Sequence, residues 1–390
     1  MPGEDSINNS NMKIAYVTID DASNVLSWSG LSYYISKSLK DGGNSINYIG
    51  NLNRDFSAVN FIKKIFYSKI MHQKFHLERT IATSKDYSKE VARRLTKTDH
   101  ELVFSPGTIP IAYLETDAPK VIYTDATFAC MLGYYDSLNN LSSDTIRQGH
   151  KVEQQALESC ALAIYSSDWA ADSAIKFYGI DASKVKVVPF GANFDVHHTE
   201  EQVNGFIHSR DKNKLKILFN GVDWKRKGGD LVLSTVKEMR RQGVDVELHI
   251  VGIRKLPFLN IPDYVKYHGF LNKSVPAEKQ KLESVYESCH FLFLPSTAEA
   301  FGCVFCEAGL FGMPSITRKT GGLETAVTDG INGFKLKMDA NMNDYASLIL
   351  DHFLDYDKYI QLAKSSYNEY NTRLNWKTAG ESLSKYIHAI

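Results

Sequence analysis

The chain of 390 residues has no excess of either charge and no long apolar run. Lys plus Arg and Asp plus Glu number 45 each, so the formal net charge is zero and the composition does not favour nucleic acid as a partner. No apolar run approaches the ~20 residues that cross a bilayer. The start, MPGEDSINNSN, lacks the apolar core of a signal peptide. We therefore expect a cytoplasmic protein.

Cysteine is scarce, and its spacing favours neither disulfides nor a metal centre. The five cysteines are an odd number without a regular rhythm. Cys303 and Cys306 form a lone CxxC, and no second pair completes a zinc site. We expect buried, reduced thiols. The only strict Asp-x-Asp, Asp355-Tyr356-Asp357, lies in a helical pattern and is better interpreted as exposed charge, so no metal is expected.

Apolar runs alternate with helical patterns along the whole chain, which predicts an α/β fold with two doubly wound parallel sheets. The predicted helix Leu31–Leu39 ends at Gly42-Gly43. We expect Rossmann-like domains over 1–195 and 196–370, with a cleft between them where the carboxyl ends of the strands meet. The predicted strands are Met12–Ile19, Ile46–Ile49, Leu102–Phe104, Lys120–Tyr123, Leu162–Ser166 and Lys186–Val188, then Lys216–Asn220, Glu247–Val251, Val265–His268, Phe291–Leu294 and Pro314–Thr317.

Two glutamates flank a predicted helix start in the run STAEAFGCVFCEAGLFGMP. The run follows an apolar strand, and Gly302 allows a ligand to approach the backbone. The first amides of a helix beginning near Cys303 lack partners and suit a phosphate. Glu299 before the helix and Glu307 inside it can accept hydrogen bonds from hydroxyls. Diphosphate together with hydroxyls indicates a nucleotide sugar.

The segment EAFGCVFCEA, followed by FGMPSITRKTGGLETAVTDGINGF, resembles the signature of the family 4 retaining glycosyltransferases, which have the GT-B fold. The resemblance extends from Met12 through Ser166–Asp195 to Phe334. It implies transfer of a hexose from a nucleoside diphosphate sugar, with UDP favoured, to a hydroxyl of a glycan or lipid-linked acceptor. The anomeric configuration would be retained, without metal or further cofactor. It also implies that the last helix, 371–390, packs back on the first domain.

The resemblance assigns donor-binding roles in the second domain. Glu299 would bind the hydroxyls of the donor sugar and Glu307 those of the ribose. Lys227 matches a family lysine that binds the donor diphosphate, in the loop that begins at Gly221. Val222 stands where the family usually has arginine, and we hypothesise that Arg226 supplies that charge. The remaining donor-binding candidates are Phe270, Leu271, Ala300, Phe301, Gly302 and Cys303.

In the first domain, Trp28-Ser29-Gly30-Leu31 resembles a loop that faces donor phosphate and acceptor, with Gly30 as a donor-binding candidate. Ser29 could instead cap the first helix. Asp125 stands where many relatives have histidine, and it could accept the proton of the acceptor hydroxyl, hold the acceptor, or cap the next helix. The candidate catalytic residues are Asp125, Arg226, Lys227 and Glu299. Gly321-Gly322 would lie near the donor or form an ordinary turn.

A local basic stretch interrupts the neutral composition. Between Phe61 and Leu95, nine Lys or Arg stand against three Asp or Glu, interleaved with apolar residues. Such a stretch can lie on anionic lipid, which predicts weak peripheral association with the inner face of the membrane. The alternative is a helix whose apolar face packs inward and whose lysines are solvated.

Two other functions fit the same resemblance. One is another GT-B enzyme, a nucleotide-sugar epimerase or a sugar phosphorylase. The other is a non-catalytic sugar-nucleotide-binding protein, in which Val222 and Asp125 would mark lost activity.

Overall fold

The computed structural model describes residues 11–25 and 27–390. The chain divides into two compact units: unit 1 comprises Met1–Val188 and Trp376–Ile390, and unit 2 comprises Pro189–Asn375. The sequence analysis placed these boundaries at residues 195 and 370. The first ten residues, where we expect no signal peptide, lie outside the described residues.

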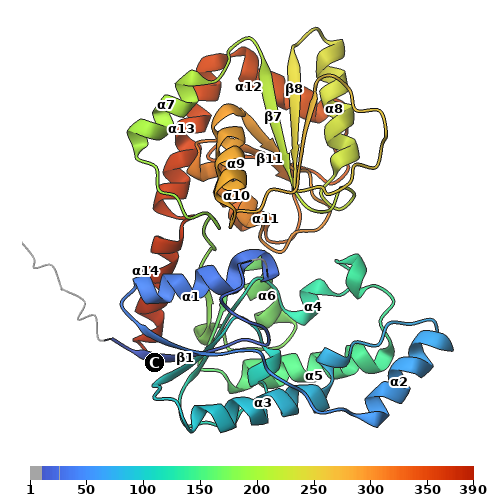
Figure 1. Ribbon diagram of the computed structural model, residues 1–390, viewed down its shortest axis with the longest axis vertical. Coiled ribbons are helices and arrows are strands. Elements are labelled where there is room, and N and C mark those ends of the chain that lie inside the picture. Colours follow the sequence, from blue (N-terminus) through green and yellow to red (C-terminus); the bar gives the residue numbers. More distant parts are fainter. Residues whose placement is uncertain (1–10, 26) are drawn as a thin grey trace, which may run out of the picture. The chain divides into compact units, whose positions relative to one another are not determined.

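Unit 1 is built on a six-stranded parallel sheet with the order β2-β1-β3-β4-β5-β6 (Figure 1). Parallel strands covered on both faces are mostly apolar, and every residue of β3, β4 and β5 is buried, including the polar Ser105, Lys120 and Thr124 at their ends. The strand order reverses beside β1, between β1 and β3. The strands are β1 (Lys13–Val17), β2 (Ser45–Ile49), β3 (Leu102–Ser105), β4 (Lys120–Thr124), β5 (Leu162–Tyr165) and β6 (Val185–Val187).

Helices cover this sheet, and the last helix of the chain is one of them. The α14 helix packs on α1, where the ring of Trp376 stacks on Tyr34 at 6.2 Å between centroids. A Cβ at Gly380 would lie 2.7 Å from the carbonyl oxygen of Ser38, so only glycine allows this close approach. The helices are α1 (Leu31–Asp41), α2 (Ala58–Lys69), α3 (Ile81–Leu95), α4 (Phe128–Met131), α5 (Ser143–Ser159), α6 (Asp168–Lys176) and α14 (Trp376–Ile387).

Unit 2 contains a second six-stranded parallel sheet, ordered β12-β11-β10-β7-β8-β9, so its order reverses between β7 and β10. The strands are β7 (Leu215–Asn220), β8 (Val246–Val251), β9 (Val265–Gly269), β10 (Phe291–Phe293), β11 (Ser315–Arg318) and β12 (Gly333–Leu336). The helices are α7 (Glu200–Ser209), α8 (Gly229–Arg241), α9 (Pro276–Ser288), α10 (Cys303–Leu310), α11 (Leu323–Ala326), α12 (Met342–Leu354) and α13 (Tyr356–Thr372).

The predicted strands are all present, with shifts at their ends, and β12 is an addition. In the described part of the chain, no helix is both long and apolar enough to cross a membrane. The five cysteines are free thiols. Cys160, Cys289 and Cys306 are buried as expected, whereas Cys130 and Cys303 are only half-buried, which corrects that part of the prediction.

Unit 2 contains buried or half-buried histidines whose pKa values are lowered, so that their rings stay neutral near pH 7. His249 and His268, on β8 and β9, stack with 5.2 Å between ring centroids. Burial, followed by the charge of His249, lowers the pKa of His268 to about 4. Burial lowers the pKa of His290 to about 3, and its Nδ1 accepts a hydrogen bond from the Lys216 amide at 3.1 Å. The folded state therefore takes up fewer protons at these side chains than the unfolded chain does.

We predict that the free energy of unfolding falls as pH drops from about 6.5 toward 4. The folded-state pKa values of His268 and His290 lie below the ordinary histidine value, so their contribution is complete above that value and is lost on acidification. Each such histidine contributes a slope of up to about 1.4 kcal/mol per pH unit. Urea denaturation at pH 7 and pH 5 should give a smaller loss in His290→Gln than in the native chain. The exposed His208→Gln is the control, and equal losses in all three proteins would refute the assignment.

Candidate functional site

The reversal of strand order in unit 2 brings Lys227 and Glu299 together. Ligands of open α/β sheets bind at such a point, outside the carboxyl ends of the strands. Lys227 follows β7 and Glu299 follows β10, and their side chains form an ion pair in which both residues are buried. Arg226 Nη1 donates to the carbonyl oxygen of Ala298 at 2.8 Å and lies 3.5 Å from Glu299 Oε2. Two cations therefore converge on one carboxylate.

Glycines make room for this ion pair. A Cβ at Gly221 would lie 2.9 Å from Lys227 Cγ, so a side chain there would displace the lysine. Gly228 has φ +76°, and a Cβ on it would lie 2.5 Å from the carbonyl oxygen of Pro295. The amide of Gly322 donates to the carbonyl oxygen of Glu299 at 3.1 Å, which gives the Gly321-Gly322 turn a role in fixing the Glu299 backbone.

The α10 helix begins at Cys303, as predicted. Its N-cap is Gly302, with φ +85° and no side-chain hydrogen bond to the first amides of the helix. A Cβ at Gly302 would lie 2.8 Å from the Phe305 ring and 3.1 Å from Glu299 Cγ. The Ala300 and Phe301 side chains are buried, and the Phe301 ring contacts Phe190 at 5.3 Å between centroids. Those two candidates can thus offer a ligand their backbone but not their side chains.

Glu307 has two partners that the sequence analysis missed. Lys273 Nζ lies 2.5 Å from Glu307 Oε1, and the Tyr286 hydroxyl donates to Oε2 at 3.0 Å. Lys273 also donates to the carbonyl oxygen of Asn193 at 2.9 Å. Burial, followed by the charge of Glu307, raises the pKa of Tyr286 well above its ordinary value, so this hydroxyl keeps its proton. The sequence did contain a sign of this role: Lys273 lies two residues after the candidate pair Phe270-Leu271.

The remaining candidates of unit 2, Phe270 and Leu271, follow β9 at the carboxyl end of the sheet. Phe270 and Leu271, after β9, are half-buried, and the Arg254 guanidinium lies 4.5 Å from the centroid of the Phe270 ring. Val222 is 69% exposed, and Arg226 makes the contacts to Ala298 and Glu299 from the neighbouring loop position.

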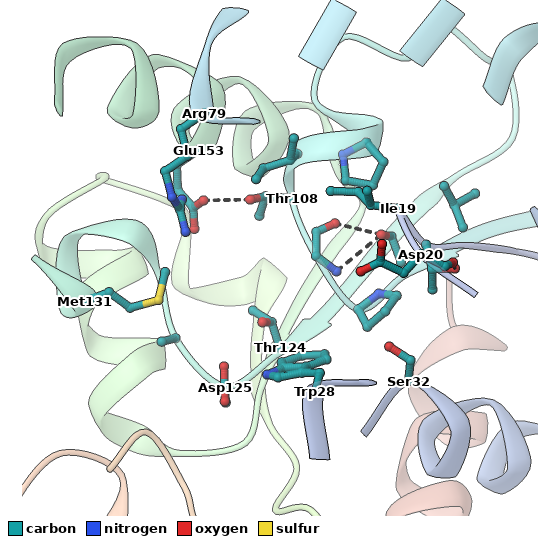
Figure 2. Close-up of a pocket in the computed structure, with 18 of the residues that line it drawn as sticks. Ile19, Asp20, Trp28, Ser32, Arg79, Thr108, Thr124, Asp125, Met131 and Glu153 are labelled. Atoms are coloured by element: carbon teal, nitrogen blue, oxygen red, sulfur yellow. Dashed lines mark hydrogen bonds between the residues drawn. The ribbon is translucent and has the colours of Figure 1, made fainter. Parts of the chain in front are cut away.

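Unit 1 has a pocket at its own point of strand reversal, which we call the unit 1 pocket. Its volume is about 310 Å³, and it is lined by residues that follow β1, β3 and β4. Trp28 and Asp125 lie near one another in it, apart from Arg79 and Glu153 (Figure 2). Other lining residues are Thr18, Asp20, Asp21, Ser32, Thr108, Thr124 and Met131.

The backbone beside this pocket is strained. Trp28 and Ser29 have φ values of +46° and +55°, and Gly30 follows with φ +84°. Left-handed backbone at a non-glycine residue costs on the order of 1–3 kcal/mol and is concentrated at functional sites. Gly30 is the N-cap of α1, which has no side-chain cap, so Ser29 does not act as the cap. The strained turn places Trp28 on the pocket.

Asp125 lines the pocket and does not cap the following helix. The N-cap of α4 is Thr127, whose hydroxyl accepts from the Cys130 amide at 3.2 Å. The capping alternative for Asp125 is therefore wrong. Its role toward an acceptor stays a prediction.

Arg79 and Glu153 are the pocket residues that the sequence analysis did not single out. The Glu153 carboxylate accepts from the Thr108 hydroxyl at 2.7 Å and from the Phe128 amide at 3.3 Å. Burial raises its pKa against the opposing influence of Thr108 and Arg79. The Arg79 guanidinium lies 4.3 Å from the Phe128 ring centroid, and burial lowers its pKa. Arg79 belongs to the basic stretch between Phe61 and Leu95, and that stretch was the feature of the sequence that could have pointed to it.

Within residues 11–25 and 27–390, no group of three His, Cys, Asp or Glu side chains is arranged to hold a metal ion. Asp355 and Asp357 are exposed, and Asp355 serves as the N-cap of α13.

Comparison with known proteins finds a family match within the second unit. Residues 201–369 match the family described as glycosyl transferases group 1. The D-inositol 3-phosphate glycosyltransferase of Paenarthrobacter aurescens is 23% identical over 252 residues, which are 63% of this chain and 61% of that protein. The corresponding protein of Xylanimonas cellulosilytica is 26% identical over 46% of each chain. The chain thus matches about half to three fifths of these relatives' length.

Solved structures share the whole fold at low identity. A sucrose-phosphate synthase from Thermosynechococcus elongatus has a TM-score of 0.70 and 14% identity, covering 97% of this chain and 99% of its own. Anabaena HepE in complex with UDP and glucose has a TM-score of 0.63 and 17% identity, covering 97% and 100%. WaaG, described as a glycosyltransferase of lipopolysaccharide biosynthesis, has a TM-score of 0.63 and 14% identity, covering 96% and 99%. The predicted GT-B fold is confirmed.

We predict that Lys273→Met destabilises the chain, because it leaves the buried Glu307 carboxylate without its cation. Breaking a fully buried pair costs about 3–5 kcal/mol; since the Lys273 side chain is 32% exposed, about 2 kcal/mol is expected. The free energy of unfolding in urea measures the loss. Lys281→Met, at an exposed lysine, is the matched control. Equal stability of the two variants would show that Glu307 does not depend on Lys273.

Proposed function

Starting from the group 1 glycosyl transferase family of residues 201–369 and the GT-B fold, we propose that this chain is a retaining hexosyltransferase that uses a nucleoside diphosphate sugar. The observation that carries the proposal is the convergence of Lys227, Arg226 and Glu299 beside the uncapped start of α10. This arrangement offers cations and amides to a diphosphate and a carboxylate to sugar hydroxyls.

The role proposed for each side chain at the donor site follows from its charge. Lys227 and Arg226 would stabilise the negative charge that grows on the departing diphosphate, replacing the metal ion that other transferases use. Glu299 and Glu307 would accept hydrogen bonds from the donor sugar and the ribose. A uridine nucleotide is the favoured donor, and the HepE structure, described in complex with UDP and glucose, supports this choice by analogy.

The unit 1 pocket would hold the acceptor, a glycan or a lipid-linked sugar. The Trp28 ring offers a flat apolar surface for a sugar ring, and Asp125 offers a carboxylate to the acceptor hydroxyl. An epimerase would need no acceptor and a phosphorylase would consume phosphate, so product analysis separates those alternatives. A non-catalytic binding protein would not hydrolyse the donor.

We predict that the native chain binds and slowly hydrolyses one of UDP-, GDP- or ADP-glucose in the presence of EDTA, with UDP-glucose the expected donor. A ligand that binds only the folded protein raises its melting temperature. Lys227→Ala should lower turnover by about 10²–10³-fold, the order found when one group that stabilises developing charge is removed. Arg226→Ala should also lower turnover, because its guanidinium faces the same carboxylate.

Lys225→Ala is the matched control, since Lys225 lies in the same loop and is exposed. Its melting temperature and turnover should equal those of the native chain. Unchanged turnover in Arg226→Ala beside an inactive Lys227→Ala would remove Arg226 from the mechanism. If no activated sugar raised the melting temperature, the donor assignment would fail.

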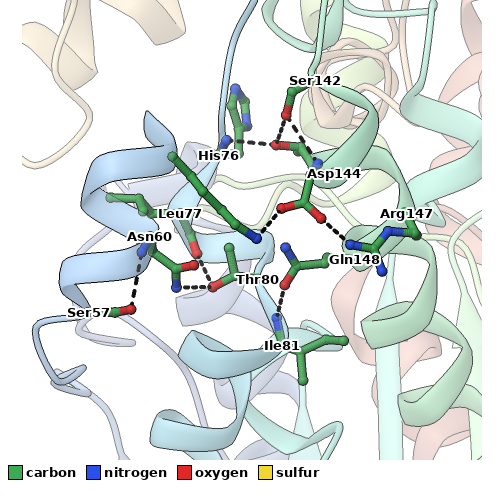
Figure 3. Close-up of polar contacts among 12 residues, drawn as sticks. Ser57, Asn60, His76, Leu77, Thr80, Ile81, Ser142, Asp144, Arg147 and Gln148 are labelled. Carbon is green, nitrogen blue, oxygen red and sulfur yellow. Dashed lines mark hydrogen bonds and ion pairs between the residues drawn. The ribbon is translucent and has the colours of Figure 1, made fainter. Parts of the chain in front are cut away.

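We also propose weak association of unit 1 with an anionic membrane surface through α2. This helix buries only Asn60, whereas its large apolar side chains are between 45% and 64% exposed. Two polar contacts hold it to unit 1: Lys63 donates to Asp144 at 2.7 Å, and Asn60 donates to Thr80 at 3.4 Å, the latter visible in Figure 3. The Tyr67 ring also stacks on Phe75 at 5.5 Å between centroids. The inward-packing alternative is therefore wrong for α2, although α3 does bury Tyr87, Val91 and Leu95. The exposed apolar set comprises Val59, Phe61, Ile62, Ile65 and Phe66.

We predict that the chain sediments with vesicles containing anionic lipid at low salt. Ile62→Asp/Ile65→Asp should weaken this binding at least about tenfold. The variant lacks two apolar side chains whose transfer from water into the membrane would contribute to binding. Leu354→Asp, at an exposed leucine of α12, should bind like the native chain. Equal recovery of the native chain in the supernatant with and without anionic vesicles would exclude the association.

A further inference from the structure

A second cavity, which we call the basic cavity, adjoins the unit 1 pocket. Its volume is about 340 Å³, and it shares Arg79 and Ile109 with the unit 1 pocket. Arg79 lies with Glu153, apart from Trp28 and Asp125 (Figure 2). The two cavities therefore meet at Arg79 and Ile109.

The lining of the basic cavity carries more positive than negative side chains. Arg54, Lys64 and Arg79 contribute three cations, and Glu78 contributes one carboxylate. In the part of the chain that the structure describes, the side chains of Arg54, Lys64 and Arg79 form no hydrogen bond or ion pair. By contrast, the neighbouring Lys63 is paired with Asp144 at 2.7 Å. A set of cations left unpaired around a cavity is suited to an anion with several acceptor oxygens.

The basic cavity also leads to the apolar surface of α2. Lys64, which lines it, lies on that helix between the exposed Phe61, Ile62, Ile65 and Phe66. Three environments thus follow one another along unit 1: a pocket with an aromatic ring and carboxylates, a cavity with cations, and an apolar surface. Their order matches a molecule with a sugar head, a phosphate and an apolar tail.

We propose that the basic cavity binds the phosphate of the acceptor, and that the acceptor is an amphiphile whose phosphate joins a hydroxylated head to an apolar chain. This inference rests on the proposed function and names its acceptor class. The phosphate contacts Arg54, Lys64 and Arg79, the head lies in the unit 1 pocket beside Trp28, and the chain leaves along α2. The donor diphosphate is bound elsewhere, by unit 2.

The test measures binding of simple probes to the full chain by calorimetry. The probes are n-octyl phosphate below its critical micelle concentration, inorganic phosphate, and n-octyl glucoside as a neutral amphiphile. Octyl phosphate should bind at least about tenfold more tightly than either of the others. Arg54→Gln/Lys64→Gln should weaken it at least about tenfold through loss of charge-assisted contacts. Lys69→Gln/Lys89→Gln loses the same charge at exposed lysines that line neither cavity and should bind within twofold of the native chain.

Each departure from this pattern overturns a defined part of the proposal. Equal binding of inorganic and octyl phosphate would remove the apolar tail and leave a site for free phosphate. Equal binding of octyl glucoside, or equal loss in both double variants, would refute the phosphate site itself. Donor hydrolysis by the native chain and by the Lys69→Gln/Lys89→Gln control reports on unit 2. Its absence in both would refute the proposed transferase, whereas hydrolysis together with a failed phosphate test would refute only the basic cavity as the acceptor site.

Discussion

The ion pair between Lys227 and Glu299 is the constraint on which the donor site depends. Neither charge could be buried alone, because a buried ion without a partner costs several kcal/mol. Their meeting requires that β7 and β10 be neighbours, that Gly221 leave room for the lysine, and that the Gly322 amide fix the Glu299 backbone. An arriving diphosphate would give the lysine a second anion, so the site is charged and organised before its ligand is present.

The same topological rule shapes unit 1, with a different chemical result. Its pocket also lies where the strand order reverses, but its lining combines Trp28, carboxylates and a single guanidinium, that of Arg79. Unit 2 thus gathers cations around a carboxylate, and the unit 1 pocket gathers an aromatic ring and carboxylates. The solved relatives share this fold at 14% and 17% identity, so the fold persists while most residues differ.

Much of the fold could be predicted because buried parallel strands are apolar along their whole length. β12 was missed because it starts at Gly333, whose missing Cβ lets the backbone approach Ser315, and has only half-buried residues after that. The start of α10 at Cys303 could be predicted from a local run, but Lys273, a partner of Glu307, comes from a distant segment. Asp125 showed the limit of local reasoning: it precedes a helix, yet Thr127 supplies the cap. The orientation of α2 depended on polar contacts with α5 that no periodicity encodes.

The return of α14 to unit 1 has a consequence for biosynthesis. Unit 1 is discontinuous in the sequence, because α14 (Trp376–Ile387) packs on its α1 helix. On the ribosome, unit 1 can therefore reach its complete form only after α14 has been synthesised, and all of unit 2 emerges in between. The Tyr34 ring lacks its stacking partner Trp376 until α14 emerges.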